Sequence, residues 1–254
     1  MKHIKTLRTK KGRKEQGSFL AEGVRLLEEA VRLRSLPADV YIAESLLSER
    51  GRQLAGQFRA RKVPVHEISA KQLERMSETR TPQGIVAVFD TPGLTLSELS
   101  PRGIRRVLLC ERVSDPGNLG TLLRSALAFG FDPVLLVASS VEPYAPKVVR
   151  SSAGAVFGLR VVVAGVEQAV AWLQSHQIAV ISADGRGEND SDGFRSRVRS
   201  GPIALALGSE AEGLSPEIIQ ASALVYRVAH EPAVESLNVA VAGSILMKQV
   251  YDCV

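Results

Sequence analysis

The stretch DPGNLGTLLRSALAFG, from Asp115 to Gly130, decides the fold because it connects a buried strand to a capped helix. It follows the nearly continuous apolar run RVLLCE (106–111), which is typical of a strand covered on both faces. Asp115 can cap the helix and Pro116 fits its first position, and the apolar residues that follow recur at the spacing of a buried helical stripe. The sequence therefore predicts a strand, a tight connection and a helix.

One residue in this stretch, Arg124, is not explained by helix formation. It lies off the apolar stripe, one turn after Gly120, and helical side chains lean toward the amino terminus of their helix. The missing side chain at Gly120 therefore leaves Arg124 a path toward the loop that holds Asn118. Capping explains the start of the helix but not this arginine, so Arg124 and Asn118 are candidate functional residues.

The same alternation of strands and helices continues through the second half of the chain. Further apolar runs follow as PVLLVA (133–138), LRVVVA (159–164), IAVISA (178–183), PIALAL (202–207) and ALVYRVA (223–229). We therefore predict an α/β domain over residues 104–254, with a parallel sheet covered by helices on both faces. Sites in such sheets gather in the loops beyond the carboxyl ends of the strands.

The first 92 residues predict a smaller domain. Residues 19–34 are expected to form an amphipathic helix and the segment that leads into it, and residues 45–60 a second helix. Strands are expected at 39–44, 63–69 and 84–90. This pattern indicates a small three-layer α/β unit. The segment TPGLTLSELSPRG (91–103) has turn-forming residues at both edges and no core stripe, so residues 93–103 are predicted to be a linker.

Positive charge is concentrated in this first domain. Residues 1–90 hold 18 Lys and Arg against 11 Asp and Glu, net +7, whereas residues 91–254 hold 14 against 16, net −2. Seven of the basic residues lie in the first fourteen positions with no acid among them. This start is interpreted either as a flexible basic arm for a polyanion or as a solvated, disordered segment.

Composition also disfavours several classes of protein. No apolar run approaches the roughly 18 residues of a membrane span, and the basic start leads into no apolar segment, so a secretory signal is not expected. Cys110 and Cys253 have no metal or redox spacing and are expected to be free thiols in a reducing compartment. We therefore expect a cytoplasmic protein with no membrane partner and no metal site.

Two loops besides the opening stretch carry polar residues at predicted strand ends. In LGSEAEGLSPE (207–217), Gly208 and Gly213 flank Glu210. Two glycines this close together let the backbone approach a ligand, or make turns that a side chain would forbid. The alternative for this loop is a tight connection that carries solvated acids.

The remaining loop, EPAVESLNVAVAGS (231–244), introduces the last helix with Ser236 and Asn238. Either residue can cap the helix, which explains one of them but not both. Ala240, Gly243 and Ser244 then keep one surface of the helix small. Such a surface suits close packing against another helix, including one from a second subunit.

Fingerprints of other α/β enzymes are absent from these loops. No G-x-G-x-x-G joins a strand to a helix, no G-x-x-x-x-G-K-[ST] occurs, and there is no G-x-S-x-G elbow. His230 lies near the third loop, where a lone histidine is usually a surface residue. A small-molecule α/β enzyme with another nucleotide cofactor, or a serine hydrolase, is therefore disfavoured.

The three loops, in this order, resemble the three sequence motifs of the SpoU (TrmH) family of RNA ribose 2′-O-methyltransferases. The matching residues are Asn118, Gly120, Arg124, Ala126, Phe129 and Gly130 in the first motif, Leu207, Gly208, Glu210, Gly213 and Leu214 in the second, and Ser236–Ala242 in the third. The resemblance covers about residues 104–254. The segments FLAEG and TPQGIVAVF also resemble the ribosomal-protein-like substrate-binding domain that often precedes the catalytic domain in this family.

This resemblance implies a SPOUT methyltransferase domain whose carboxyl-terminal part forms a trefoil knot, an exception to the rule that chains avoid knots. It also implies S-adenosylmethionine as cofactor and a homodimer with the site near its interface. The implied cofactor-binding residues are Leu207, Gly208, Gly213, Val228 and Leu237. Val228 begins the triplet Val-Ala-His, where relatives usually have Ile-Pro-Met.

The catalytic residues implied by the resemblance are Arg124, Asn118, Glu210, Ser236 and Asn238. In related enzymes the arginine has been assigned as general base together with the substrate phosphate. A guanidinium is expected to stay protonated, so it can instead stabilise a developing alkoxide or clamp the phosphate. Ribosomal RNA is the preferred substrate, because an added binding domain suggests recognition of a folded RNA loop. The alternatives are a transfer RNA 2′-O-methyltransferase and a non-catalytic RNA-binding module of the same fold.

Overall fold

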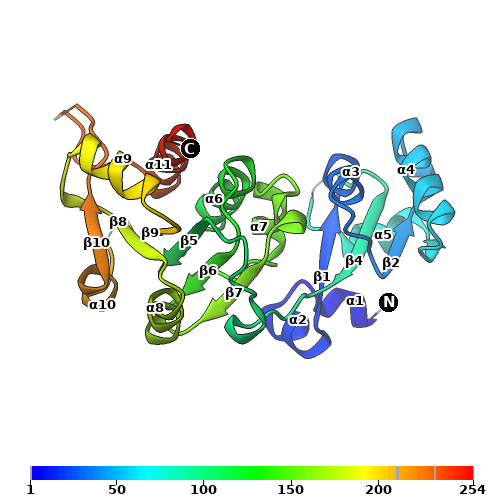
Figure 1. Cartoon of the computed structure of the whole chain (residues 1–254). Helices are drawn as coiled ribbons and strands as arrows, with labels where there is room; N and C mark the ends of the chain where they lie inside the picture. Colours follow the sequence, from blue (N-terminus) through cyan, green and yellow to red (C-terminus); the bar gives the residue numbers. More distant parts are fainter. Residues whose placement is uncertain (1, 80, 210–211, 232, 254) are drawn as a thin grey trace. The chain divides into compact units, whose positions relative to one another are not determined.

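The computed structural model describes residues 2–79, 81–209, 212–231 and 233–253, which form two compact units (Figure 1). The first unit contains the chain up to Gly93 together with Glu142–Gly158, and the second contains Leu94–Val141 and Leu159–Val254. This division differs from the predicted domains in two places. Residues 94–103, expected as a linker, belong to the second unit, and residues 142–158, expected in the second domain, belong to the first.

The first unit is built on a mixed four-stranded sheet in the order β1-β4-β2-β3. Strand β4 runs antiparallel to both β1 and β2, while β2 and β3 are parallel. Its elements are α1 (Lys2–Thr6), α2 (Lys10–Gln16), β1 (Ser18–Glu22), α3 (Val24–Arg32), β2 (Asp39–Ile42), η1 (Glu44–Leu46), α4 (Glu49–Ala60), β3 (Val65–Glu67), α5 (Ala70–Met76), β4 (Ile85–Asp90), α7 (Pro146–Ser151) and η3 (Ala155–Gly158).

Both faces of this sheet are covered, as the three-layer pattern predicted. Leu20 and Val86 pack with residues of α1 and α5 on one face, and the alternating residues Phe19 and Ile85 are buried on the other. Residues 19–22 were expected to approach a helix, but they form β1, with Phe19 opposite Phe89. The helix begins only after Gly23, whose φ of 105° turns the chain in a way that favours glycine.

The basic start of the chain is helical, which corrects the expectation of a flexible or disordered segment. Thr9 caps α2 by accepting a hydrogen bond from the Gly12 amide, and Leu7 between the two helices is buried. Arg13 is also buried, and its guanidinium donates to both carboxylate oxygens of Glu142, each at 2.7 Å. Apolar and ionic contacts that the charge count did not reveal therefore order this segment.

The segment 142–158 joins the first unit through aromatic contacts as well as through Glu142. The Tyr144 ring lies 4.8 Å from the Phe19 ring, and the Phe157 ring lies 4.6 Å from the Phe89 ring, centroid to centroid. Aromatic pairs at these separations contribute packing beyond their buried area. Strand periodicity alone cannot indicate this contact, because the partners are more than 60 residues apart.

The second unit contains the predicted parallel sheet, in the order β10-β8-β9-β5-β6-β7 with every neighbouring pair parallel. Its elements are η2 (Leu96–Glu98), β5 (Arg106–Glu111), α6 (Pro116–Ala128), β6 (Val134–Val137), β7 (Val161–Ala164), α8 (Val166–Ser175), β8 (Ala179–Glu188), α9 (Ser191–Arg199), β9 (Ile203–Leu207), α10 (Pro216–Gln220), β10 (Ser222–Tyr226) and α11 (Val239–Asp252). Helices α8 and α10 cover one face, and α6, α9 and α11 cover the other (Figure 1).

The core of this unit explains why the expected linker belongs to it. Leu99 and Ile104 are buried in the cluster formed by β5, β9 and α8, and Leu94 and Leu96 pack against the same cluster. Cys110 on β5 is fully buried, and burial raises the pKa of its thiol to about 12. Neither cysteine, both of which lie in the described part of the chain, forms a disulfide.

Candidate functional site

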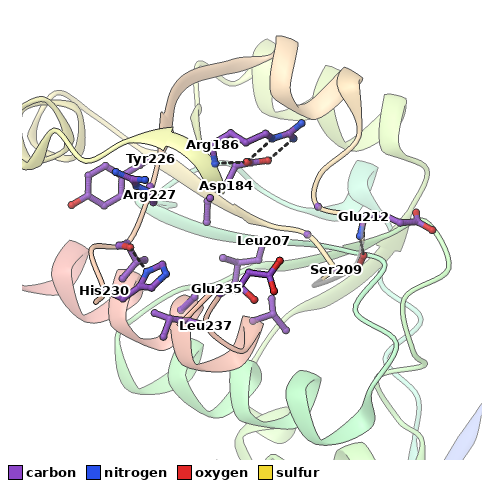
Figure 2. Close-up of a pocket in the computed structure, with 18 residues that line it drawn as sticks. Asp184, Arg186, Leu207, Ser209, Glu212, Tyr226, Arg227, His230, Glu235 and Leu237 are labelled. Atoms are coloured by element: carbon purple, nitrogen blue, oxygen red, sulfur yellow. Dashed lines mark hydrogen bonds and ion pairs between the residues drawn. The ribbon is translucent and has the colours of Figure 1, made fainter. Parts of the chain in front are cut away.

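A cavity of about 470 Å³ opens at the carboxyl ends of β8, β9 and β10, where the sheet topology predicted a site (Figure 2). Its lining comes from Ala183–Arg186, from Leu207–Ser209, Glu212 and Gly213, from Tyr226–Val228, and from His230, Glu235–Leu237, Val239 and Ala242. The volume is within the range of about 300–1,000 Å³ that is usual for small-molecule sites.

The second sequence motif forms one wall through close backbone packing. A Cβ atom on Gly208 would lie 2.3 Å from the carbonyl carbon of Gly213, so no other residue fits there without moving the loop. Gly213 donates its amide to the Ser209 carbonyl at 2.9 Å and has a φ of 67°, which favours glycine. The two glycines thus fold the loop tightly onto itself, and a ligand can meet the backbone at its rim.

The third motif forms the opposite wall and leads into α11. Asn238 is the helix cap: its Oδ1 accepts hydrogen bonds from the Ala240 and Val241 amides at 3.0 and 3.3 Å. This leaves Ser236 and Leu237 to line the cavity. Gly243 brings α11 close to the sheet, because a Cβ there would lie 2.5 Å from a methyl group of Leu207 and 2.6 Å from one of Leu122.

The first motif joins the third through an amide pair. Asp115 caps α6 as predicted, with its carboxylate accepting the Asn118 amide at 2.8 Å. The Nδ2 of Asn238 donates to the Oδ1 of Asn118 at 3.1 Å. Ser125 on α6 and Ser244 on α11 are also hydrogen-bonded, at 2.7 Å. The small surface of the last helix therefore packs against α6 of the same chain.

Three carboxylates, of Asp184, Glu212 and Glu235, and two guanidinium groups, of Arg186 and Arg227, line the cavity. Asp184 is nearly buried and is paired with Arg186, whose Nη2 lies 2.8 Å from its Oδ2. The Arg186 side chain donates hydrogen bonds to Asp184 and holds the pKa of this carboxyl below its ordinary value, while burial opposes the shift. Glu212 and Glu235 add exposed carboxylates (Figure 2). Asp184 and Glu212 are ion-paired with arginines, whereas Glu235 has no ion-pair partner among the described residues, so its carboxylate can meet a positively charged group of a ligand.

The structure brings together the predicted cofactor-binding residues around this one cavity, together with Ser236. These are Leu207, Gly208, Gly213, Val228 and Leu237. Asn118 and Asn238 meet each other at its edge, whereas Arg124 is exposed on α6 and does not line the cavity. The predicted residue Glu210 lies outside the described residues.

Sequence reasoning missed several lining residues, among them the charged pair Asp184 and Arg186. They lie on β8, which runs to Glu188 and so extends past the apolar run that predicted it. The alternation of polar residues with glycine in ADGRGE is the signal that marks this extension. His230 lines the cavity, and its ring Nδ1 lies 2.9 Å from the Val228 carbonyl oxygen.

Other kinds of site were also sought. Within the described ranges, no group of three or more His, Cys, Asp and Glu side chains is arranged to hold a metal ion. Among the helices of the described chain, none is both long enough and apolar enough to cross a membrane.

Comparison with known families and proteins gives consistent matches over both halves of the chain. A family described as the SpoU rRNA Methylase family matches residues 105–248, and one described as an MRM3-like substrate binding domain matches residues 1–87. The 23S rRNA (guanosine(2553)-2′-O)-methyltransferase RlmP of Bacillus subtilis is 30% identical over 247 residues, covering 97% of this chain and 94% of that protein.

Two further similar proteins agree with these matches. An uncharacterized tRNA/rRNA methyltransferase of Synechocystis sp. is 31% identical over 248 residues, covering 97% of this chain and 88% of its own length. The AdoMet-bound crystal structure of an rRNA methyltransferase from Sinorhizobium meliloti superposes with a TM-score of 0.85 at 28% identity, covering 98% of this chain and 92% of that one.

Proposed function

This chain belongs to the SpoU methylase family, and we propose that it transfers a methyl group from S-adenosylmethionine to a ribose 2′-hydroxyl of ribosomal RNA. The resemblance inferred from the three motifs is thereby confirmed. The observation that carries the proposal is the cavity itself: the two motif loops, more than 20 residues apart in sequence, meet there at the strand ends. The first unit, matched by a substrate-binding family, is the domain we assign to RNA recognition.

The residues of the cavity fit S-adenosylmethionine in shape and charge. Leu207, Val228 and Leu237 provide apolar surface, and the backbone of the glycine loop provides exposed amides and carbonyls. The Glu235 carboxylate, which has no ion-pair partner among the described residues, suits a ligand with a sulfonium and an ammonium group. When bound, this cofactor supplies an electrophilic methyl group attached to positively charged sulfur.

Side chains of the first and third motifs supply the polar groups for the ribose. Ser236 is exposed at the cavity rim and can hydrogen-bond the sugar. The side chains of Asn118 and Asn238 are hydrogen-bonded to each other, and this bond fixes the position of the start of α6 relative to the start of α11. Holding the 2′-oxygen in line with the methyl group is the first requirement of a displacement reaction.

Arg124 is the group we assign to the RNA side of the reaction. It is exposed, and in the described part of the chain its guanidinium forms no hydrogen bond or ion pair. An arginine that no described residue neutralises is available to a phosphate or to the oxygen that loses its proton. It can clamp the phosphate or stabilise the negative charge that develops on the 2′-oxygen.

We further propose a homodimer formed by the second unit. The predicted reason was the small surface of α11, but that surface contacts α6. The support now comes from Val241 and Ile245, which lie one helical turn apart on α11 and are 48% and 37% exposed. Apolar side chains in a row are typical of a surface that a second subunit covers.

The trefoil knot and the cytoplasmic location are proposals of the same kind. The knot is supported by α11, which packs on α6 and β9 although the preceding strand, β10, lies at the sheet edge. The cytoplasm is supported by the two free thiols. Sedimentation of the purified protein tests the dimer, and cell fractionation tests the location.

The experiment that tests the function measures transfer of labelled methyl groups from S-adenosylmethionine to RNA. We expect ribosomal RNA to be labelled and the product to carry a 2′-O-methyl group, found by mapping RNA from cells with and without the protein. Labelling of transfer RNA alone would assign the other substrate class. Cofactor binding without transfer to any cellular RNA would contradict catalysis.

A further inference from the structure

Arg112 has a backbone conformation that an arginine rarely adopts. It follows β5 directly, and its φ of 53° lies in the left-handed region that favours glycine. A non-glycine residue in this region persists when its side chain makes contacts that offset the strain. The contacts of Arg112 therefore indicate what this position does.

The guanidinium of Arg112 bridges the first loop to the second. Its Nη2 donates to the Gly213 carbonyl at 3.1 Å, and its Nε lies 3.0 Å from the Glu212 carboxylate. On the other side, Nη1 donates to Glu111 Oε1, also at 3.1 Å. Glu212 and Gly213 both line the cofactor cavity, whereas Arg112 does not.

Glu111 extends the same set of contacts. Its side chain is fully buried, and its Oε2 accepts the Ser215 amide at 2.7 Å. A buried carboxylate destabilises the fold unless charged and hydrogen-bonding partners compensate it. Arg112 and Ser215 are those partners, so two adjacent residues at the end of β5 hold both ends of segment 212–215.

We propose that Arg112, supported by Glu111, is a positioning residue that holds segment 212–215 in the shape that binds the cofactor. The inference rests on the proposed function for the identity of the ligand. It goes beyond the three motifs, because neither residue belongs to the matched positions. Arg112 acts through the Gly213 carbonyl and the Glu212 carboxylate, and it does not touch the ligand itself.

The expected size of the effect follows from how often the segment has the binding shape. If loss of the guanidinium leaves that shape populated about a tenth of the time, the apparent affinity falls about tenfold. The reaction on bound cofactor is unaffected, because the groups that face the RNA are on other elements. The KM for S-adenosylmethionine should therefore rise while kcat stays within about twofold.

Arg112→Gly is the variant that isolates the side chain. Glycine adopts the observed φ without strain, so the substitution adds no backbone strain; it removes the contacts of the guanidinium, including the cation that compensates the buried Glu111 carboxylate. Calorimetry should show a dissociation constant for S-adenosylmethionine about tenfold higher. Without cofactor, the Gly213 and Ser215 amides should exchange hydrogen faster. Arg112→Lys keeps the charge but loses the planar fork, so it should give an intermediate affinity.

Arg160→Ala is the matched control. Arg160 is also paired with a carboxylate, with Nε 2.9 Å from Asp132 Oδ2, but it precedes β7 at the opposite end of the sheet. Its loss should leave cofactor affinity and exchange at Gly213 and Ser215 unchanged. Arg112→Gly with wild-type exchange at both amides, or with wild-type cofactor affinity, would overturn the proposal. A wild-type protein that does not bind S-adenosylmethionine would reject the proposed function, and the exchange comparison would then decide the role of Arg112.

Discussion

An arginine of the first unit and an arginine of the second unit differ in what they contact. In the first unit, Arg13 is buried and binds both oxygens of Glu142, and it also donates to the Leu7 carbonyl at 2.8 Å. In the second unit, Arg124 is exposed and, within the described residues, its guanidinium has no partner. The comparison teaches that a high local density of positive charge does not show which basic side chains are available to a polyanion. Neutralised arginines hold the fold, and an arginine without a partner is available to substrate.

The largest expected effect is the loss of methyl transfer in Arg124→Ala. We expect the single-turnover rate to fall about a hundredfold or more, the scale seen when one preorganised group is removed from a transition state. Folding should be unaffected, because alanine is the better helix former and the side chain is exposed. Cofactor affinity by calorimetry should also stay at the wild-type value.

Arg124→Lys tells how the arginine acts. Lysine keeps the charge but cannot form two parallel hydrogen bonds to one phosphate or oxygen pair. Substantial recovery of rate would indicate simple electrostatic stabilisation, and little recovery would indicate bidentate positioning. A near-normal rate of methyl transfer for Arg124→Ala would show that Arg124 has no role in the reaction.

The next largest effect is on the free energy of unfolding and comes from loss of Arg13, which is paired with Glu142. Arg13→Ala leaves Glu142 without its cation and removes the bond to Leu7, so we expect the free energy of unfolding to fall by about 2 kcal/mol. This figure is below the 3–5 kcal/mol for a fully buried pair, because Glu142 is partly exposed. Urea denaturation measures it. Glu142→Gln, which keeps the shape, is the matched variant, and unchanged stability in both would show that the pair does not order the segment.

The sequence predicted the second unit better than the first for a physical reason. Strands β5, β6 and β9 are nearly continuous apolar runs, and strands that are buried on both faces of a parallel sheet require that pattern. In the first unit the order of segments depends on distant contacts, such as Arg13 with Glu142. Neither periodicity nor charge counts record such pairs, so the start of the chain was expected to be disordered or flexible.

The candidate site divides in the same way. The glycines of the second motif indicated one wall of the cavity, since the close approach at Gly208 excludes a larger side chain. Asp184 and Arg186 were not predicted because they lie on an extension of β8 that has no apolar pattern. A role for Arg112 was not predicted because its left-handed backbone conformation and its contacts are seen only in the structure.

A third, smaller effect tests the ion pair between Asp184 and Arg186 in the lining of the cavity. Asp184→Asn frees Arg186 to present its full charge to a cationic ligand, so we expect affinity for S-adenosylmethionine to fall about fivefold, or about 1 kcal/mol. Because the pKa of Asp184 is lowered, this carboxyl stays ionised at neutral pH, and the contribution is lost only as pH falls through that lowered pKa. The difference between variant and wild type should therefore be constant from pH 6 to pH 8.

Calorimetry of the double variant sharpens this result. Adding Arg186→Gln to Asp184→Asn removes the uncompensated cation and should restore most of the affinity. A double variant as weak as the single one would show that Asp184 contacts the ligand directly and that the pairing is incidental.

The smallest expected effect concerns the exposed lysines of the first unit. Lys10 and Lys14 lie on α2 beside the buried Arg13, and in the described structure neither forms an ion pair. If they meet RNA phosphates, the double variant Lys10→Gln, Lys14→Gln should bind ribosomal RNA a few-fold more weakly. It should also reduce the salt slope of log K by about 0.7–0.9 per lost contact. Stability should change by a few tenths of a kcal/mol at most, since only Lys14 is near a helix carboxyl end.

Arg50→Gln is the control that separates local contact from total charge, because it removes one positive charge that is already paired. The Arg50 guanidinium on α4 lies 2.5 Å from Glu28. A general effect of net charge would flatten the salt dependence for Arg50→Gln about half as much as for the double lysine variant, since one charge is lost and not two. A contact effect would flatten it only for the lysines. An unchanged slope in the lysine variant would mean that α2 is only structural. In that case Lys10 and Lys14 would not contact RNA, and the RNA contacts would lie elsewhere on the chain.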